Sequence, residues 1–209
     1  MPNRKRLLKS SYSGTQIEAG CDEAGRGCLA GPVFAAAVIL PPDYRHHLLN
    51  DSKQLSEKLR YRLRKDIERD ALCCAVDYIL PFEIDNLNIL KASILAMHKA
   101  LDKLSLLPEL LLIDGNKFLK YKHIPHKCII KGDAQFLSIA AASIIAKTYR
   151  DDYMNEIHLE YNWYFWDRNK GYATAEHRRA IEKHGISPHH RKSFRLMNNQ
   201  LSIEFDELN

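Results

Sequence analysis

The chain has 209 residues, of which 45% are hydrophobic and 27% charged, with a formal net charge of +5 at pH 7. This length and composition predict one globular domain, and no apolar run approaches the roughly 20 residues of a membrane-spanning helix. We therefore expect a cytoplasmic protein with no membrane partner. The mild positive charge is compatible with an acidic partner but does not require one.

The N-terminal part of the chain predicts a tail and two strands. Residues 1–14 are polar and basic, which is typical of a flexible tail. Residues 17–21 predict a first strand, and the apolar run 33–40 predicts a second. The connection between them is rich in glycine and closes with Gly31-Pro32, so we expect the two strands to pair antiparallel.

The middle of the chain predicts two helices and a strand. A helix begins near Ser56, because apolar residues recur at every fourth position through residue 67. A strand at 74–80 ends before Pro81, and the apolar spacing of residues 84–104 predicts one long helix.

The second half of the chain alternates strands with helices. Residues 110–113 are wholly apolar, which is typical of a central strand buried on both faces, and 128–130 repeat the pattern. Helical periodicity covers 136–161, and Thr174 caps a shorter helix that ends at His184. We therefore predict an α/β domain at 15–197, with a mixed five-stranded sheet flanked by helices and a helical C-terminal extension. Residues 198–209 form an acidic tail.

Acidic residues follow three of the predicted strands. Asp22 and Glu23 follow the first strand, Asp114 ends the strand at 110–113, and Asp133 comes after 128–130. Strand ends in an open α/β sheet commonly line a ligand site. Four carboxylates repel one another unless a cation neutralises them, and all-oxygen ligands select Mg²⁺ or Mn²⁺ over zinc. Two such ions suit in-line hydrolysis of a phosphodiester.

Two considerations weigh against such a site. Any one of these acids could be an ordinary turn residue, above all Asp114, which precedes a glycine, although three acidic strand ends together favour a site. Neighbouring residues of an ideal strand also point to opposite faces. Asp22 and Glu23 can therefore share a site only if the strand breaks between them, and Ala24-Gly25 is a suitable point for that break.

Other kinds of site fit the sequence less well. Gly25, Gly27 and Gly31 come within one residue of the spacing of a dinucleotide-binding fingerprint. That fingerprint opens a helix, whereas residues 33–40 predict a strand, so we exclude it. The cysteines and histidines lack the spacing of a zinc site, and no nucleophile elbow supports serine–histidine catalysis.

The run from Cys21 to Val33 resembles the opening signature of bacterial type 2 ribonucleases H, the ribonuclease HII family. The other matching motifs are Asp51-Ser52-Lys53, Ile113-Asp114-Gly115-Asn116, Lys131-Gly132-Asp133, the helical run 139–147, Arg150-Asp151 and Gly171-Tyr172. The resemblance implies a ribonuclease H-like fold and a metal-dependent endonuclease. Such an enzyme hydrolyses the RNA strand of RNA–DNA hybrids and nicks duplex DNA on the 5′ side of a single ribonucleotide, leaving a 3′-hydroxyl and a 5′-phosphate.

The resemblance also implies roles for individual residues. Gly25-Arg26-Gly27 would read the 2′-hydroxyl of the ribonucleotide, largely through backbone groups. Tyr172 would stack on the deoxyribose that follows the ribonucleotide. Lys53 would lie near a substrate phosphate, with Ser143 and Lys147 close to it. The catalytic carboxylates, holding two Mn²⁺ or Mg²⁺ ions, would be Asp22, Glu23, Asp114 and Asp133.

Several alternatives stay open at this point. Cys28 stands where many relatives have proline, and Lys147 could instead be a solvated surface charge. No C-terminal motif for docking a sliding clamp is visible, so that partner is unsupported. We expect a monomer that acts on RNA–DNA hybrids and ribonucleotide-containing duplex DNA, in ribonucleotide excision and RNA primer removal. The rival functions are a nucleic-acid-binding module without catalysis and another metal-dependent nuclease of the same fold.

Overall fold

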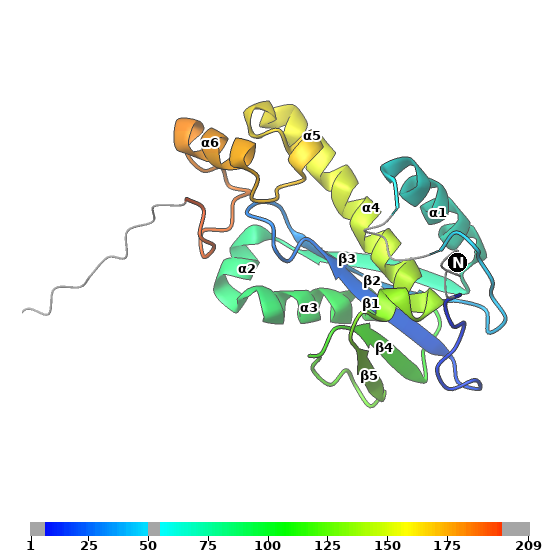
Figure 1. The fold of residues 1–209 in the computed structure, drawn as a ribbon. Coiled ribbons are helices and arrows are strands. Elements are labelled where there is room, and N and C mark those ends of the chain that lie inside the picture. The colour runs from blue at the N-terminus through cyan, green and yellow to red at the C-terminus, as the bar shows by residue number, and fades with distance from the viewer. Residues whose placement is uncertain (1–6, 50–54, 198–209) are drawn as a thin grey trace, which may run out of the picture.

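The computed structural model describes residues 7–49 and 55–197. Its centre is one five-stranded mixed sheet with the strand order β3-β2-β1-β4-β5 (Figure 1). The pairs β1–β2 and β2–β3 are antiparallel, whereas β1–β4 and β4–β5 are parallel. The predicted α/β class and five-stranded mixed sheet are therefore confirmed. The strands are β1 (Glu18–Ala24), β2 (Val33–Ile39), β3 (Cys73–Ile79), β4 (Leu110–Asp114) and β5 (His126–Ile129).

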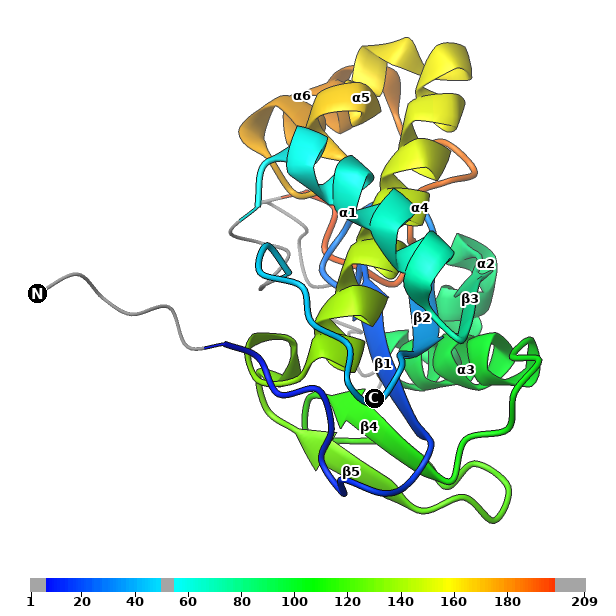
Figure 2. The same ribbon diagram turned by 90° about the vertical axis from the view of Figure 1, so that its right-hand side faces the viewer.

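Helices cover both faces of the sheet. Figure 2 shows α3 and α4 on opposite sides of β1 and β2. Every residue of β2 is buried because helices cover both faces of the strand. Its sequence is therefore apolar throughout and does not alternate apolar with polar residues. The helices are α1 (Glu57–Asp70), α2 (Pro81–Leu87), α3 (Ile89–Asp102), α4 (Leu137–Glu160), α5 (Trp166–Asn169) and α6 (Ala175–His184).

Small residues bring α4 close to the central strand. A Cβ atom on Gly20 would lie 2.2 Å from the carbonyl carbon of Ser138, so only glycine fits at this point of β1. The start of α4 is a run of alanines, all fully buried against Ala36 and Val38 of β2. This close approach fixes the position of α4 relative to β1, and with it the side chains that α4 directs at the strand.

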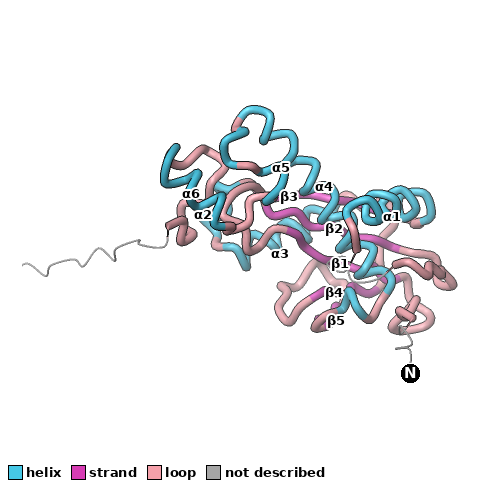
Figure 3. Tube along the Cα trace, turned by 45° about the horizontal axis from the view of Figure 1, so that its top comes forward, coloured by secondary structure: helices cyan, strands magenta, loops and turns pink. Residues whose placement is uncertain are grey.

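The C-terminal helices form a separate layer beyond one end of the sheet. Figure 3 shows α5 and α6 grouped there, and the far end of α4 packs against them. Their apolar core contains Trp166, Tyr164 and Ile181, and it also includes Leu29 and Ala30 from the connection between β1 and β2. The predicted helical extension thus packs directly against the glycine-rich connection.

Most predicted element boundaries agree with the structure, with one clear exception. Ser56 caps α1 through the N–H of Leu59, and Thr174 caps α6 through the N–H of His177. The single helix predicted over 84–104 is wrong, because the chain forms α2 and α3 with Asn88 between them. Asn88 has a φ of 69°, and its side chain accepts a hydrogen bond from the N–H of Lys91, so it ends one helix and caps the next.

Part of the predicted N-terminal tail contacts the domain. Lys9 forms a parallel bridge with Phe136, and the Glu18 carboxylate accepts hydrogen bonds from the N–H groups of Tyr12 and Ser13. This differs from the flexible tail expected from composition, because backbone hydrogen bonds outweigh the polar character of the segment. Residues 1–6 and the predicted acidic tail lie outside the described residues. In the described part of the chain, no helix is long and apolar enough to cross a membrane.

Candidate active site

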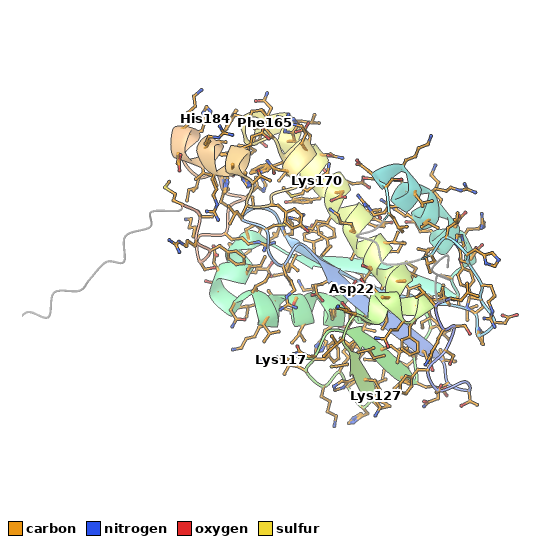
Figure 4. The ribbon with its side chains drawn as sticks, in the orientation of Figure 1. Asp22, Lys117, Lys127, Phe165, Lys170 and His184 are labelled. Atoms are coloured by element: carbon orange, nitrogen blue, oxygen red, sulfur yellow. The ribbon has the colours of Figure 1, made fainter. Side chains whose placement is uncertain are left out.

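Asp22 and Asp114 lie side by side on neighbouring parallel strands. The register pairs Cys21 with Ile113, so the next residues along the two strands, Asp22 and Asp114, are level. Both carboxylates point to the face covered by α4, since side chains alternate along each strand. Figure 4 shows Asp22 at the centre of the molecule, between α4 and β4.

Strand β1 continues without a break through Asp22 and Glu23. Asp22 pairs with Ala36 and Glu23 with Ala35, and the strand ends only after Ala24. The strand therefore does not break between the two acids, and it ends at Ala24-Gly25, the point named for the break, where Gly25 has a φ of 93°. The Oε1 atom of Glu23 accepts a hydrogen bond from Nη1 of Arg26 at 3.0 Å, and the Glu23 charge is near enough to raise the pKa of Asp22.

The Asp22 carboxylate is buried among like charges. Its side chain is 4% exposed. Burial raises its pKa well above the ordinary value, and the negative charges of Glu23 and Asp114 raise the pKa further. Two hydrogen bonds act in the opposite direction and lower the pKa of Asp22. One comes from Ser143 on α4, and the other comes from the N–H of Glu23 at 2.7 Å. The carboxylates thus form an anionic site that favours a bound cation.

Asp133 lies in a turn next to Asp114 and not at a strand end. Strand β5 ends at Ile129, and Asp133 lies in the 3-10 turn Gly132–Ala134, where it is 3% exposed. The prediction that this acid ends a strand is therefore wrong. The N–H of Gly132 donates to Oδ1 of Asp114 at 2.7 Å, which ties the turn to the end of β4. Asp114 thereby links the Asp133 turn to β1.

The donor chemistry of these residues fits a divalent cation. The candidate donors are carboxylate oxygens, which suit Mg²⁺ or Mn²⁺, and a cation would relieve the repulsion at Asp22. However, within residues 7–49 and 55–197 no three His, Cys, Asp or Glu side chains are gathered closely enough to hold a metal ion.

The Gly25-Arg26-Gly27 segment forms an exposed β-turn directly after β1. The N–H of Cys28 donates to the carbonyl of Gly25 at 3.3 Å, and Gly25 has a φ of 93°, in the region that favours glycine. Arg26 and Gly27 are exposed, whereas the residues on either side are buried. This turn therefore offers accessible backbone close in sequence to the carboxylates of β1.

Tyr172 and Lys147 lie together beside this turn. Nζ of Lys147 is 5.8 Å from the centroid of the Tyr172 ring, and that ring remains 43% exposed. The Lys147 ammonium also donates to Oδ1 of the buried Asp151 at 2.6 Å. It is therefore a half-buried, paired charge and not a fully solvated one. Burial and the neighbouring Cys28 thiol raise the pKa of Tyr172.

The two remaining predicted residues are Ser143 and Lys53. Ser143 is 5% exposed, and its hydroxyl bonds the Asp22 carboxylate, so it supports an acid from below the surface. Lys53 lies outside the described residues.

Two fully buried arginines next to the site have no role in the sequence-based interpretation. Arg150 on α4 and Arg191 in the C-terminal segment both donate to backbone carbonyls of the connection between β1 and β2. A lone arginine in a basic stretch carries no periodic signal and is usually on the surface. Only the Arg150-Asp151 motif pointed to one of them.

Comparisons with known proteins identify the family of the chain. The family model described as Ribonuclease HII matches residues 19–197. Ribonuclease HII of Parabacteroides distasonis is 64% identical over 190 residues, covering 91% of this chain and 96% of the relative. Ribonuclease HII of Bacteroides thetaiotaomicron is 63% identical over 190 residues, covering 90% and 95%.

Solved structures with lower sequence identity share the fold. Ribonuclease H2 from Pyrococcus horikoshii superposes with a TM-score of 0.75 at 22% identity, covering 86% of this chain and 94% of that one. A ribonuclease HII solved in complex with PCNA, from Archaeoglobus fulgidus, gives 0.70 at 23% identity, covering 90% and 98%. Bst-RNase HIII in complex with Mn²⁺ gives 0.66 at 21% identity, covering 91% and 69%. From the family model and the close relatives, the chain belongs to the ribonuclease HII family of ribonuclease H endonucleases.

Proposed function

We propose that this ribonuclease H nicks duplex DNA on the 5′ side of a single embedded ribonucleotide and also cleaves the RNA strand of RNA–DNA hybrids. The products would carry a 3′-hydroxyl and a 5′-phosphate, which suits ribonucleotide excision and RNA primer removal. One observation carries the proposal: the buried Asp22, level with Asp114, is three residues from the exposed turn at Gly25. The group that cuts would therefore lie near the end of β1, and the group that selects the substrate would lie in the turn that follows it.

The carboxylates of Asp22, Glu23, Asp114 and Asp133 would hold divalent ions, Mn²⁺ or Mg²⁺, and we expect two. The raised pKa of Asp22, caused by burial and neighbouring negative charge, supports a cation at this position. A more distant structural neighbour was solved in complex with Mn²⁺. When bound, such ions supply an activated water and stabilise negative charge on the departing oxygen. Ser143 would hold the Asp22 carboxylate in place through its hydrogen bond.

The exposed turn would recognise the ribonucleotide. Arg26 and Gly27 are exposed, and among the described residues no group accepts a hydrogen bond from the backbone N–H of either. A 2′-hydroxyl can accept from such donors, and deoxyribose has no atom that can. The exposed ring of Tyr172 offers a flat apolar surface for the next sugar, and Lys147 beside it, with Lys53, would contact phosphate.

Exposed lysines near the carboxylates support binding to a nucleic-acid backbone. Lys117 and Lys127 lie on the side of the molecule formed by β4 and β5 (Figure 4), and Lys131 precedes the Asp133 turn. Together they give a positive rim to an anionic centre, as a phosphodiester substrate requires. We propose that the protein acts as a monomer in the cytoplasm. The distant PCNA complex leaves a sliding clamp as an open partner for this chain.

One assay tests this function. The protein is incubated with Mn²⁺ or Mg²⁺ and a labelled duplex that carries one ribonucleotide, and in parallel with the identical all-DNA duplex. We expect a single nick on the 5′ side of the ribonucleotide and an intact all-DNA duplex.

The alternative functions give different results in the same assay. Equal cutting of both duplexes would indicate another nuclease of the same fold and contradict the proposed role of the turn. Binding without cutting, under conditions where a related ribonuclease HII is active, would indicate a binding module.

A further inference from the structure

Two buried arginines hold the backbone that carries the exposed turn. From the C-terminal segment, Arg191 donates through Nη1 to the carbonyl of Arg26 at 2.9 Å, and through Nε and Nη2 to the carbonyl of Gly31 at 3.0 and 2.8 Å. From α4, Arg150 donates to the carbonyls of Pro32 and Ala30, each at 3.0 Å. Both ends of the connection between β1 and β2 are therefore fixed by guanidinium groups.

Burying these two guanidinium groups is unfavourable for the free energy of folding. Both side chains are 0% exposed, and within the described residues neither forms an ion pair with a carboxylate. Burial and the nearby charge of Arg150 lower the pKa of Arg191 to about 10. Buried like charges destabilise a fold, and hydrogen bonds to backbone carbonyls offset part of that cost. All but one of these hydrogen bonds go to the connection between β1 and β2, so this connection is the segment that the two arginines fix.

The contact from Arg191 to Arg26 determines which way a neighbouring amide points. A trans peptide group is planar, and its C=O and N–H point in opposite directions. The peptide bonds of the described chain are trans. Because Arg191 draws the carbonyl of Arg26 into the protein, the N–H of the same peptide group, which belongs to Gly27, must point outward. That N–H has no acceptor among the described residues.

We propose that Arg191 is a positioning residue for substrate selection: it orients the Arg26–Gly27 peptide so that the Gly27 N–H is presented to the 2′-hydroxyl. The inference rests on the proposed function of the turn and assigns the orientation of its donor to a side chain about 165 residues further along the chain. Arg150 holds the other end of the connection through the carbonyls of Ala30 and Pro32, so the whole connection is fixed relative to α4.

The variant Arg191→Lys tests the proposal. Lysine keeps the positive charge but cannot donate to Arg26 and Gly31 at once from a planar fork. The matched control is Arg178→Lys, because Arg178 also donates through its guanidinium to two backbone carbonyls, those of Arg195 and Leu196, but away from the turn. KM and kcat are measured on the single-ribonucleotide duplex, and the all-DNA duplex is used as an inhibitor to obtain its Ki.

We expect Arg191→Lys to raise KM for the ribonucleotide duplex by at least about tenfold, the effect of losing a charge-assisted hydrogen-bond geometry. The Ki of the all-DNA duplex should stay near the parent value, and Arg178→Lys should leave all three constants near parent values. A variant that is merely less folded would lose kcat in proportion to its unfolded fraction, with KM and Ki unchanged. That pattern, or an unchanged ratio of KM to Ki, would overturn the proposal.

A measurement on the parent protein covers the case in which Arg191→Lys does not fold. In ¹⁵N NMR spectra, the Gly27 amide signal should shift on addition of the ribonucleotide duplex and stay in place on addition of the all-DNA duplex. Equal shifts with both duplexes would overturn the orientation assigned to this peptide. If the parent enzyme itself does not distinguish the two duplexes in cleavage, the proposed function fails before the role of Arg191 is tested.

Discussion

Arg150 passes so close to Gly25 that a Cβ atom on this glycine would lie 2.0 Å from the guanidinium Nε. Nε is the atom that donates to the carbonyl of Pro32, so Gly25→Ala must displace a buried hydrogen bond. It must also place alanine at a φ of 93°. We expect the free energy of unfolding to fall by about 1–3 kcal/mol, as measured by urea denaturation.

Gly27→Ala provides the matched comparison. No protein atom lies within 4 Å of the Cβ position at Gly27, so the free energy of unfolding should change by less than about 1 kcal/mol. In the proposed function the added methyl group would face the substrate, and we expect kcat/KM on the ribonucleotide duplex to fall by at least about tenfold. Equal destabilisation of the two variants would contradict the contact with Arg150.

Asp22→Asn should abolish cleavage and preserve binding. Asparagine keeps the shape of the side chain but removes a negative donor oxygen, so kcat should fall by about a thousandfold or more. Affinity for the duplex, measured by fluorescence anisotropy, should be unchanged or slightly higher because a negative charge is lost. Asp152→Asn is the control, since Asp152 is half exposed and pairs with Arg64 at the surface. Turnover of Asp22→Asn at the parent rate would show that the metal site is elsewhere.

Mn²⁺ should stabilise the folded protein through the same carboxylates. At about 100 times its dissociation constant, a ligand that binds only the native state adds about 2.7 kcal/mol to the free energy of unfolding. We expect a higher thermal midpoint with Mn²⁺ for the parent and for Asp152→Asn, and a much smaller shift for Asp22→Asn. Equal shifts in all three proteins would indicate metal binding away from Asp22.

Stability should decline below about pH 6.5 because of two buried histidines. Burial and the neighbouring His177 lower the pKa of His190 to about 3, and burial lowers the pKa of His177 as well. Between pH 6.5 and 3 the unfolded chain binds protons that the folded chain does not, so stability falls as the pH falls. Each ring contributes up to about 1.4 kcal/mol per pH unit.

Urea denaturation between pH 7 and pH 5 measures this dependence. His190→Asn keeps an acceptor for the N–H of Ser187, which bonds Nδ1 of His190 at 2.9 Å, but does not titrate in this range. The slope of stability against pH should therefore decrease in His190→Asn and persist in His123→Asn, which changes an exposed ring. An unchanged slope in His190→Asn would assign the acid sensitivity to other groups.

Binding to duplex should weaken steeply with salt. Phosphate contacts release counterions, so four or more contacts would weaken binding about a hundredfold between about 50 and 200 mM salt. Lys117→Gln should reduce the slope of log Kd against log salt by about one contact. Lys103→Gln should leave it unchanged, because Lys103 pairs with Asp77 on β3, at the other edge of the sheet from β5. A flat salt response of the parent would argue against a duplex groove.

Local patterns were sufficient for most elements and insufficient where the backbone departs from them. Ser56 and Thr174 predict the starts of their helices correctly, because a capping hydroxyl group accepts from an N–H three residues along the chain and depends only on local sequence. The division of the helix at Asn88 was not predicted, because the apolar spacing continues across this residue. The helix is divided by the left-handed backbone conformation of Asn88. Asp133 was placed at a strand end, yet a tertiary hydrogen bond from Gly132 to Asp114 holds it in a turn.

The sequence by itself determined the mixed α/β fold, the carboxylates as candidate metal donors and the glycine turn beside them, because each depends on residue type and short-range spacing. Only the tertiary structure decided that Asp22 and Asp114 are level on one face of the sheet, since this depends on the parallel register of β1 and β4. It also decided that Arg150 and Arg191 hold the turn. Contacts between residues so far apart in sequence leave no periodic pattern, so the packing of the C-terminal helices against the turn determines them.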